Sequence, residues 1–273
     1  MKIALTGASG FVGTILQREF NDCVIIKRDA SEADILKKLQ DVDTVINLAG
    51  APIIKRWSKS YKKVLYNSRI ETTKKLVNAI NKSEVKHFIS SSAIGIYPDN
   101  TTCNEECSKS ADDFLANLVK DWEKEALKCQ KPTAILRLGV VLGANGGALK
   151  KMLLPFKLGL GGVIGDGSMV TSWIDIKDLI RIYRFILQNS LTGTFNAVSP
   201  NPVTNKILTK ELASALNRPA VLPLPKFVLK LIYGEASVVL TASKEVYPKA
   251  LLKEGFEFKY PTIRDSFKGL VKK

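Results

Sequence analysis

Three glycines near the start of the chain have the spacing of a phosphate-binding turn. Gly7, Gly10 and Gly13 follow the strand-like run at residues 2–6 and precede an amphipathic stretch. In such a turn the first glycine permits a tight bend, the second lets backbone N–H groups approach a pyrophosphate, and the third lets helix pack on strand. We therefore expect a dinucleotide. The spacing is G-x-x-G-x-x-G and differs from the G-x-G-x-x-G of dehydrogenases, so an ordinary glycine-rich loop is the alternative.

Two basic residues after the next strand-like run, residues 24–26, favour one dinucleotide over the other. Lys27 and Arg28 stand where NAD-selective proteins carry an acidic residue for the ribose hydroxyls. A guanidinium suits a 2′-phosphate, so NADP(H) is favoured over NAD(H). The alternative is that both belong to the general surface of a chain with 41 basic residues, and Asp29 follows them.

The elements that position these residues alternate between strands and helices, which predicts an α/β fold of the Rossmann type with a doubly wound parallel sheet. Expected strands are residues 2–6, 24–26, 44–48, 87–90, 133–142 and 193–198. Expected helices are residues 31–39, 58–81, 111–129, 148–158 and about 175–188. Beyond Pro200 prolines become frequent, which indicates a smaller C-terminal substrate lobe. We expect an NADP-binding domain at 1–200, with 143–170 contributing to the lobe, and the lobe itself at 201–273.

Composition narrows the classes of function. The formal charge of +15 raises the question of nucleic acid, but the lysines are scattered through predicted helices without an aromatic-interleaved stripe, so we expect no nucleic-acid partner. No apolar stretch reaches the roughly 20 residues of a membrane span and no signal peptide is visible, so we expect a cytoplasmic protein without a membrane partner. With four cysteines and one histidine, we expect reduced thiols and no metal site.

Several motifs together resemble the extended short-chain dehydrogenase/reductase superfamily, the NAD(P)-dependent epimerase/dehydratases. They are GASGFVG at 7–13, NLAG at 47–50, the serines at 90–92 and SWID at 172–175. More narrowly, the chain resembles an atypical epimerase-like family whose members are sometimes labelled cell-division inhibitors. That resemblance rests on Arg56-Trp57, the run 67–73, Trp122-Glu123, the stretch 139–162 and a tail similar to the family's C-terminal epimerase-associated domain.

The resemblance implies a set of cofactor contacts. It assigns Gly7, Ser9, Gly10, Phe11, Val12 and Gly13 to the pyrophosphate and Arg28 to the 2′-phosphate. It assigns Leu48, Ala49 and Gly50 to the adenosine ribose, Arg69 to a contact from its helix, and Gly139 and Val140 to the nicotinamide side. Arg69 has an alternative as a surface residue paired with a glutamate, and the apolar members would be buried in any such sheet.

Catalysis is where the sequence departs from the superfamily, which uses a tyrosine as acid/base and a lysine four residues on. The helix at 111–129 has Phe114, Leu115, Leu118 and Val119 instead, and no tyrosine in the chain has a lysine four residues later. By resemblance, Ser92 would polarise a substrate. Tyr97 is our first candidate for proton transfer and Asp175 the second. Tyr97 could equally be a loop aromatic, and Ser91 and Ser92 cofactor contacts or caps.

Two functions stay open. The first is an NADP(H)-dependent oxidoreductase or epimerase acting on a small polar or nucleotide-linked substrate, with Arg56, Trp57 and Lys151 available for anionic substrate groups. The second is a non-catalytic NADP(H)-binding sensor or regulatory protein, which the apolar face of the helix at 111–129 favours. The intact glycine turn and the complete lobe favour the first. The sequence fixes neither the substrate nor the oligomeric state, with a homodimer as one option.

Overall fold

A six-stranded parallel sheet forms the centre of the computed structural model, which describes residues 1–271. Its order is β10-β6-β4-β3-β1-β2, and every neighbouring pair is parallel. The strands are β1 (Ile3–Thr6), β2 (Val24–Ile26), β3 (Thr44–Asn47), β4 (His87–Ala93), β6 (Thr133–Leu138) and β10 (Gly193–Ala197). The predicted Rossmann-like α/β fold is confirmed. The strand order reverses between β1 and β3, which is the switch point of the sheet. Ligands of such sheets bind at the carboxyl ends of the strands beside the switch point.

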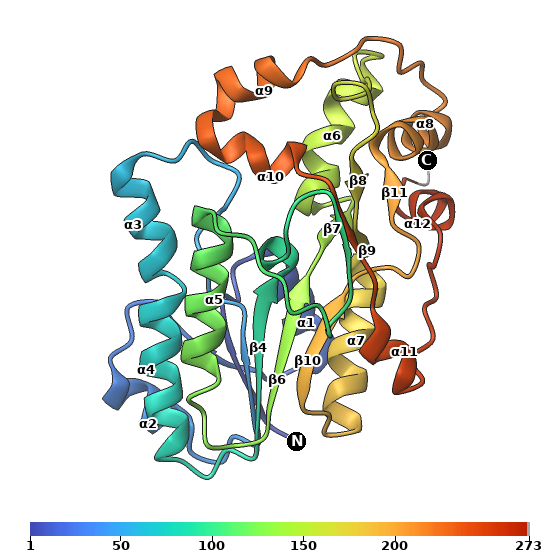
Figure 1. The fold of residues 1–273 in the computed structure, drawn as a ribbon. Coiled ribbons are helices and arrows are strands. Elements are labelled where there is room, and N and C mark those ends of the chain that lie inside the picture. The colour runs from blue at the N-terminus through green and yellow to red at the C-terminus, as the bar shows by residue number, and fades with distance from the viewer. Residues whose placement is uncertain (272–273) are drawn as a thin grey trace.

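Helices cover both faces of the sheet (Figure 1). On one face, α1 (Phe11–Phe20) and α7 (Ile176–Gln188) pack through Leu16 and Leu179, which have no solvent exposure. The other face carries α2 (Glu32–Lys38), α3 (Lys59–Asn67), α4 (Ile70–Asn81) and α5 (Phe114–Ala126). Ser31, Ser58 and Asp113 begin α2, α3 and α5 by accepting a hydrogen bond from a backbone N–H of the first turn.

Most of the remaining elements gather above the carboxyl ends of the strands, whereas residues 249–253 lie beside the edge strand β10 (Figure 1). The helices are α6 (Gly147–Lys157), α8 (Asn205–Leu216), α9 (Lys226–Tyr233), α10 (Val238–Thr241), α11 (Lys249–Lys253) and α12 (Ile263–Leu270). Short strand pairs join β7 (Val140–Gly143) to β9 (Trp173–Asp175), β8 (Val170–Thr171) to β11 (Val203–Thr204), and β5 (Thr101–Cys103) to β12 (Lys244–Val246). Two 3-10 turns are η1 (Ile94–Ile96) and η2 (Gly234–Ser237). We call this set, apart from β5 and η1, the lobe.

Two predicted elements are each divided in the structure. The helix expected at 58–81 is interrupted by a turn at Ser68 and Arg69, where the Arg69 N–H donates to the Tyr66 carbonyl at 3.0 Å and the Ser68 hydroxyl accepts the Ala51 N–H at 2.9 Å. The strand expected at 133–142 breaks at Gly139, after which β7 leaves the main sheet to pair with β9. A Cβ at Gly139 would lie 2.7 Å from the carbonyl oxygen of Ser172, so this departure requires glycine.

No helix among residues 1–271 has both the length and the apolar character needed to cross a bilayer. Over the same residues, no three His, Cys, Asp or Glu side chains cluster in a way that could hold a metal ion.

Candidate functional site

The glycine turn joins β1 to α1 with its backbone tightly constrained. Gly7 has φ of +66°, and a Cβ there would lie 2.6 Å from the carbonyl oxygen of Leu48. A Cβ at Gly13 would lie 2.4 Å from the carbonyl oxygen of Gly7. Gly10 precedes the helix and supplies no side-chain cap, so the first N–H groups of α1 are free to receive an anion. Ser9 and Gly10 are exposed beside them.

Phe11 and Val12 have side chains that face inward. The Phe11 ring lies beneath the turn that begins α6, since a Cβ at Gly143 or Gly146 would come within 2.4 or 2.1 Å of ring atoms. Val12 packs against the core cluster beneath the sheet. These two residues can therefore offer an anion only their backbone N–H groups, while the Phe11 ring connects the turn to the lobe.

Three cations line a pocket at the carboxyl end of β2. Lys27 and Arg28 contribute from the strand end, and Lys75 from α4, with Thr6 and Thr72 among the other lining residues. The sequence alone does not single out Lys75, which is one of the many lysines scattered through predicted helices. The available signal was its position three residues after Thr72, because residues three apart share one helix face.

The end of β3 is held by a buried amide. Asn47 has no solvent exposure; its Oδ1 accepts the Thr6 hydroxyl at 2.7 Å, and its Nδ2 donates to the Thr73 hydroxyl at 2.9 Å. The Thr6 hydroxyl also accepts the N–H groups of Leu48 and Ala49 at 3.1 and 3.2 Å. These bonds fix the path of the backbone to Gly50 at the switch point of the sheet.

Arg69 lies at the same edge without a carboxylate partner among residues 1–271. Its guanidinium donates to the carbonyl oxygens of Leu65 and Ala51 at 3.3 and 3.1 Å and lies 5.3 Å from the Trp122 ring centroid. A Cβ at Gly50 would lie 3.0 Å from this guanidinium. Burial lowers the pKa of Arg69 to about 10, so the group is still a cation at neutral pH. The alternative of a surface arginine paired with a glutamate does not hold in this structure.

Ser92, at the end of β4, joins a buried ion pair. Its hydroxyl donates to the carboxylate of Glu123 on α5. Arg137 on β6 donates to both oxygens of that carboxylate at 2.8 Å, through Nε and Nη2. Burial alone would lower the pKa of Arg137, but its hydrogen bonds to Glu123 and the charge of Glu123 raise it above the ordinary value. The sequence singles out Glu123 only as part of the Trp122-Glu123 motif, without a role in the site, and does not single out Arg137.

Tyr97 extends this network toward β10. Its side chain is 1% exposed; its hydroxyl accepts a hydrogen bond from Arg137 at 2.8 Å and donates to Asn196 at 2.9 Å. Burial raises the pKa of the Tyr97 phenol, while the charge of Arg137 acts in the opposite direction. Ser92 and Tyr97 thus bond to two neighbouring members of one network, Glu123 and Arg137, although their hydroxyls do not bond to each other. Both are buried in the described structure.

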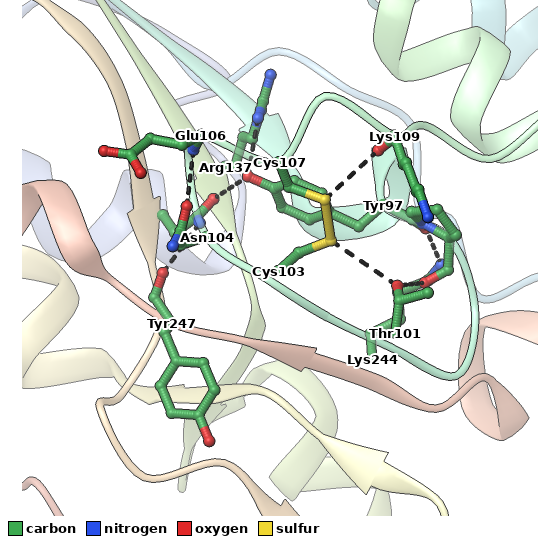
Figure 2. The surroundings of a disulfide bond; sticks show 12 residues. Tyr97, Thr101, Cys103, Asn104, Glu106, Cys107, Lys109, Arg137, Lys244 and Tyr247 are labelled. Carbon is green, nitrogen blue, oxygen red and sulfur yellow. Dashed lines mark hydrogen bonds between the residues drawn. A yellow bond between two sulfur atoms is a disulfide. The ribbon is translucent and has the colours of Figure 1, made fainter.

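A short disulfide loop covers Tyr97 (Figure 2). The expectation of reduced thiols is wrong for one cysteine pair, because Cys103 and Cys107 form a disulfide. A turn closed by the Cys107 N–H and the Asn104 carbonyl, at 3.1 Å, brings the two Cα atoms to 5.4 Å, within reach of such a bond. Cys103 and Tyr97 belong to one apolar cluster, and Lys244 of β12 donates to the Tyr97 carbonyl.

The face of α5 that would carry a tyrosine and lysine is filled by packing. Leu115 lies against Gly95, where a Cβ would approach a leucine methyl to 3.0 Å, and Val119 is 2% exposed. Phe114, Leu115 and Leu118 pack with η2 and α10 of the lobe, through Ala236 and Val238 among others. The C-terminal segment therefore covers the position that the superfamily uses for acid/base chemistry.

Other predicted residues lie along the same edge. Val140 begins β7 directly after the break at Gly139, with its N–H donating to the Ser172 carbonyl at 2.9 Å. Trp57 is 8% exposed, packs edge-on against Phe114 and donates to the Ile53 carbonyl, so it is a packing residue. Arg56 donates to the carbonyl of Leu231 at 3.3 Å, and Lys151 approaches the carbonyl of Ile54 at 3.4 Å.

Two family models match the chain. The model of the NAD dependent epimerase/dehydratase family matches residues 3–197, and a domain of unknown function, DUF1731, matches residues 224–270. An Arabidopsis thaliana protein, "Epimerase family protein SDR39U1 homolog, chloroplastic", is 35% identical over 301 residues, which cover 99% of this chain and 87% of the plant protein.

Solved structures agree with these matches. A crystal structure of human epimerase family protein SDR39U1 (isoform2) with NADPH has a TM-score of 0.92 and 31% identity, covering 99% of each chain. The nucleoside-diphosphate sugar epimerase from Corynebacterium glutamicum has a TM-score of 0.80 and 29% identity, covering 99% of this chain and 58% of that one.

Proposed function

Because this chain belongs to the NAD dependent epimerase/dehydratase family, as an SDR39U1-like member with a C-terminal DUF1731 domain, we propose that it is an NADPH-dependent oxidoreductase of the epimerase type. Its substrate would be a small polar or nucleotide-linked molecule held between the sheet edge and the lobe. The human relative crystallised with NADPH supports the cofactor.

The observation that carries the proposal is a series of positive groups at the switch-point edge that no carboxylate in residues 1–271 neutralises. These groups are the uncapped start of α1, the basic pocket with Arg28 and Lys75, and the guanidinium of Arg69. A dinucleotide phosphate has the charge to match each of them. The residues present therefore fit NADPH, with the glycine turn at the pyrophosphate and Arg28 at the 2′-phosphate.

Bound NADPH would supply a hydride to a carbonyl of the substrate. The proton must come from elsewhere, and Tyr97 is the candidate because the Arg137 cation stabilises charge on its hydroxyl oxygen at 2.8 Å. Ser92 would orient the substrate oxygen after exchanging its hydrogen bond to Glu123 for one to the substrate. Leu48 to Gly50 and Gly139 to Val140 would line the two ends of the cofactor.

A second function has its own support. Ser92 and Tyr97 are 2% and 1% exposed, and the lobe packs on the face of α5 that would carry the usual acid/base pair. This arrangement favours a non-catalytic NADPH-binding sensor, in which cofactor occupancy sets the position of the lobe.

One experiment separates the two functions. NADPH is titrated by tryptophan fluorescence, for which Trp122 beside Arg69 is a local reporter, and oxidation of bound NADPH is then followed with a panel of carbonyl compounds and nucleotide sugars. For the enzyme, Ser92→Ala abolishes turnover and leaves NADPH affinity nearly unchanged, whereas the surface control Ser110→Ala alters neither. Binding without turnover across the panel favours the sensor, and absence of NADPH binding would reject both.

A further inference from the structure

Two segments of the lobe combine exposed apolar side chains with an exclusively basic charge. Residues 144–165 and 212–234 contain no aspartate or glutamate and six basic residues: Lys150, Lys151, Lys157, Arg218, Lys226 and Lys230. Of fourteen exposed large hydrophobic side chains among the described residues, eight lie in these segments: Leu154, Leu158, Leu160, Val221, Leu222, Phe227, Leu231 and Ile232. The six basic residues and these eight apolar residues together form what we call the basic apolar face.

The two segments lie side by side. The Arg218 Nε donates to the carbonyl of Lys157 at 3.1 Å. Leu224 exchanges backbone hydrogen bonds with the other segment, donating to Val163 at 2.8 Å and accepting from Gly165 at 2.9 Å. Figure 1 shows their helices, α6 and α9, at the end of the molecule opposite the N-terminus. The residues of the two segments therefore lie at one end of the molecule, where their apolar side chains are exposed to solvent.

The helix α9 has an alternating surface. Phe227 and Leu231 are 70% and 73% exposed, and Lys226 and Lys230 are also exposed. Each pair is separated by four residues, so each forms a row along the helix, and the two rows are adjacent. Leu229 is the residue of this helix that turns inward. A row of apolar side chains next to a row of lysines is the pattern of a helix lying in a lipid headgroup region, where lysines extend to phosphates.

Charge decides among the occupants of this face. A second copy would use the same patch on both subunits and would bring six cations against six cations. An anionic partner is attracted by all of them. We propose that the basic apolar face docks on the surface of an anionic lipid bilayer, with the apolar side chains inserted among the acyl chains. The absence of a membrane-spanning stretch, which led us to expect no membrane partner, does not bear on such peripheral binding.

The test is co-sedimentation of the full chain with vesicles of phosphatidylcholine, with and without phosphatidylglycerol. We expect binding to the anionic vesicles only, decreasing as salt increases. Lys226→Gln with Lys230→Gln should weaken partitioning about thirtyfold, and Phe227→Ser with Leu231→Ser by at least as much. Matched controls outside the face are Lys63→Gln with Lys124→Gln, and Leu127→Ser with Leu252→Ser; both should bind as the parent does. Circular dichroism and NADPH titration verify that each variant is folded.

Several outcomes overturn the proposal. Equal binding to both vesicle types, or equal loss in face and control variants, removes the face as a lipid site. Concentration-dependent dimerisation that Phe227→Ser with Leu231→Ser abolishes, without vesicle binding, assigns the face to a second copy. Binding to polyglutamate but to neither vesicle type assigns it to an acidic protein.

Discussion

At the end of β2, the guanidinium of Arg28 is the group expected to distinguish the two nicotinamide cofactors. Arg28→Ala should weaken NADPH binding roughly 10- to 150-fold, the equivalent of about 1.5–3 kcal/mol for a hydrogen bond to a charged group. NADH binding should change little, because NADH lacks the 2′-phosphate. Fluorescence titration with both cofactors measures this, with Arg264→Ala on α12 as the control. Equal weakening of both cofactors would contradict the assignment.

Lys75 should act in the same direction as Arg28. It lines the same pocket from α4, so Lys75→Ala should also reduce NADPH affinity selectively, by less than Arg28→Ala because an ammonium makes no bidentate contact. The neighbouring Lys74 is exposed and does not line this pocket, which makes Lys74→Ala the matched control. The titration is repeated at several salt concentrations, and a loss shared equally by both variants would indicate a nonspecific charge effect.

Glu123 should be important for stability as well as for the site. Glu123→Gln leaves the Arg137 guanidinium without its charged partner at a position where both side chains are at most 13% exposed. Removing one member of such a pair costs about 3–5 kcal/mol in the free energy of unfolding. Glu125→Gln, two residues along α5, loses only an ion pair to the exposed Lys128 and should cost under about 1 kcal/mol. Urea unfolding measures both, and similar losses would mean that the network adds nothing beyond a surface pair.

On the scale of elements, the glycine turn depends on close approach as well as on backbone conformation. Gly7 and Gly159 both have positive φ, +66° and +73°, but a Cβ at Gly159 has its nearest neighbour at 3.7 Å. Gly159→Ala should therefore cost only the conformational penalty of about 1–2 kcal/mol. Gly7→Ala adds the contact with Leu48 at 2.6 Å and should cost about 3 kcal/mol or more. Equal unfolding free energies for the two variants would show that the turn relaxes away from β3.

The six strands of the main sheet and the glycine turn could be predicted because their signals are local. β-branched runs and glycine spacing depend only on neighbouring residues. The interruption between α3 and α4 could not be predicted, since the periodicity of residues 58–81 is helical throughout. The Leu65 carbonyl accepts the Ser68 hydroxyl in place of the Arg69 N–H, and that hydroxyl is held by the N–H of Ala51, seventeen residues away. That interruption aims Arg69 at Gly50, so a non-local hydrogen bond positions a predicted cofactor contact.

The partners in the buried network around Ser92 and Tyr97 could not be predicted from the sequence either. Ser92 and Tyr97 could be singled out from the end of β4, but their partners Glu123, Arg137 and Asn196 come from three other elements. Nothing in the sequence indicates that these elements converge. The absent tyrosine–lysine pair was visible as an apolar helix face, whereas its physical reason, packing of η2 and α10 on α5, required the fold.

For the whole molecule, polar side chains of the SWID motif join segments of the lobe to one another and to α7. The Ser172 hydroxyl accepts the Val246 N–H at 2.8 Å and donates to the Lys244 carbonyl at 2.8 Å. Asp175 caps α7 and accepts the Ser266 hydroxyl at 2.7 Å. Asp175 thus connects α7, which covers the sheet, to α12 of the lobe, and this is a structural role for our second proton-transfer candidate.

Asp178 should be the strongest of these attachments. It has no solvent exposure and accepts the N–H groups of Lys259 and Tyr260 at 3.0 and 2.8 Å and the Arg181 guanidinium at 2.7 Å. Asp178→Asn keeps the shape but loses the charge, with an expected cost of about 1.5–3 kcal/mol. Hydrogen exchange should accelerate at residues 256–270 first, while the exposed control Asp112→Asn leaves exchange unchanged. Uniform acceleration across the chain would mean that lobe and sheet unfold as one unit.

Acid stability of the whole fold should depend on its single histidine. The His87 Nε2 donates to the Leu191 carbonyl at 3.0 Å, and burial lowers the pKa of His87 despite that bond. The unfolded chain has the ordinary value of about 6.5. As pH falls below that value, the histidine of the unfolded state binds a proton while the buried histidine of the folded state stays neutral. The free energy of unfolding therefore decreases by up to about 1.4 kcal/mol per pH unit. The decrease ends where the folded histidine also becomes protonated. His87→Gln removes this contribution, and the difference in unfolding free energy between parent and variant should shrink from pH 7.5 to pH 5.5. The lone imidazole resonance reports the folded pKa directly, and a value at or above 6.5 would contradict the prediction.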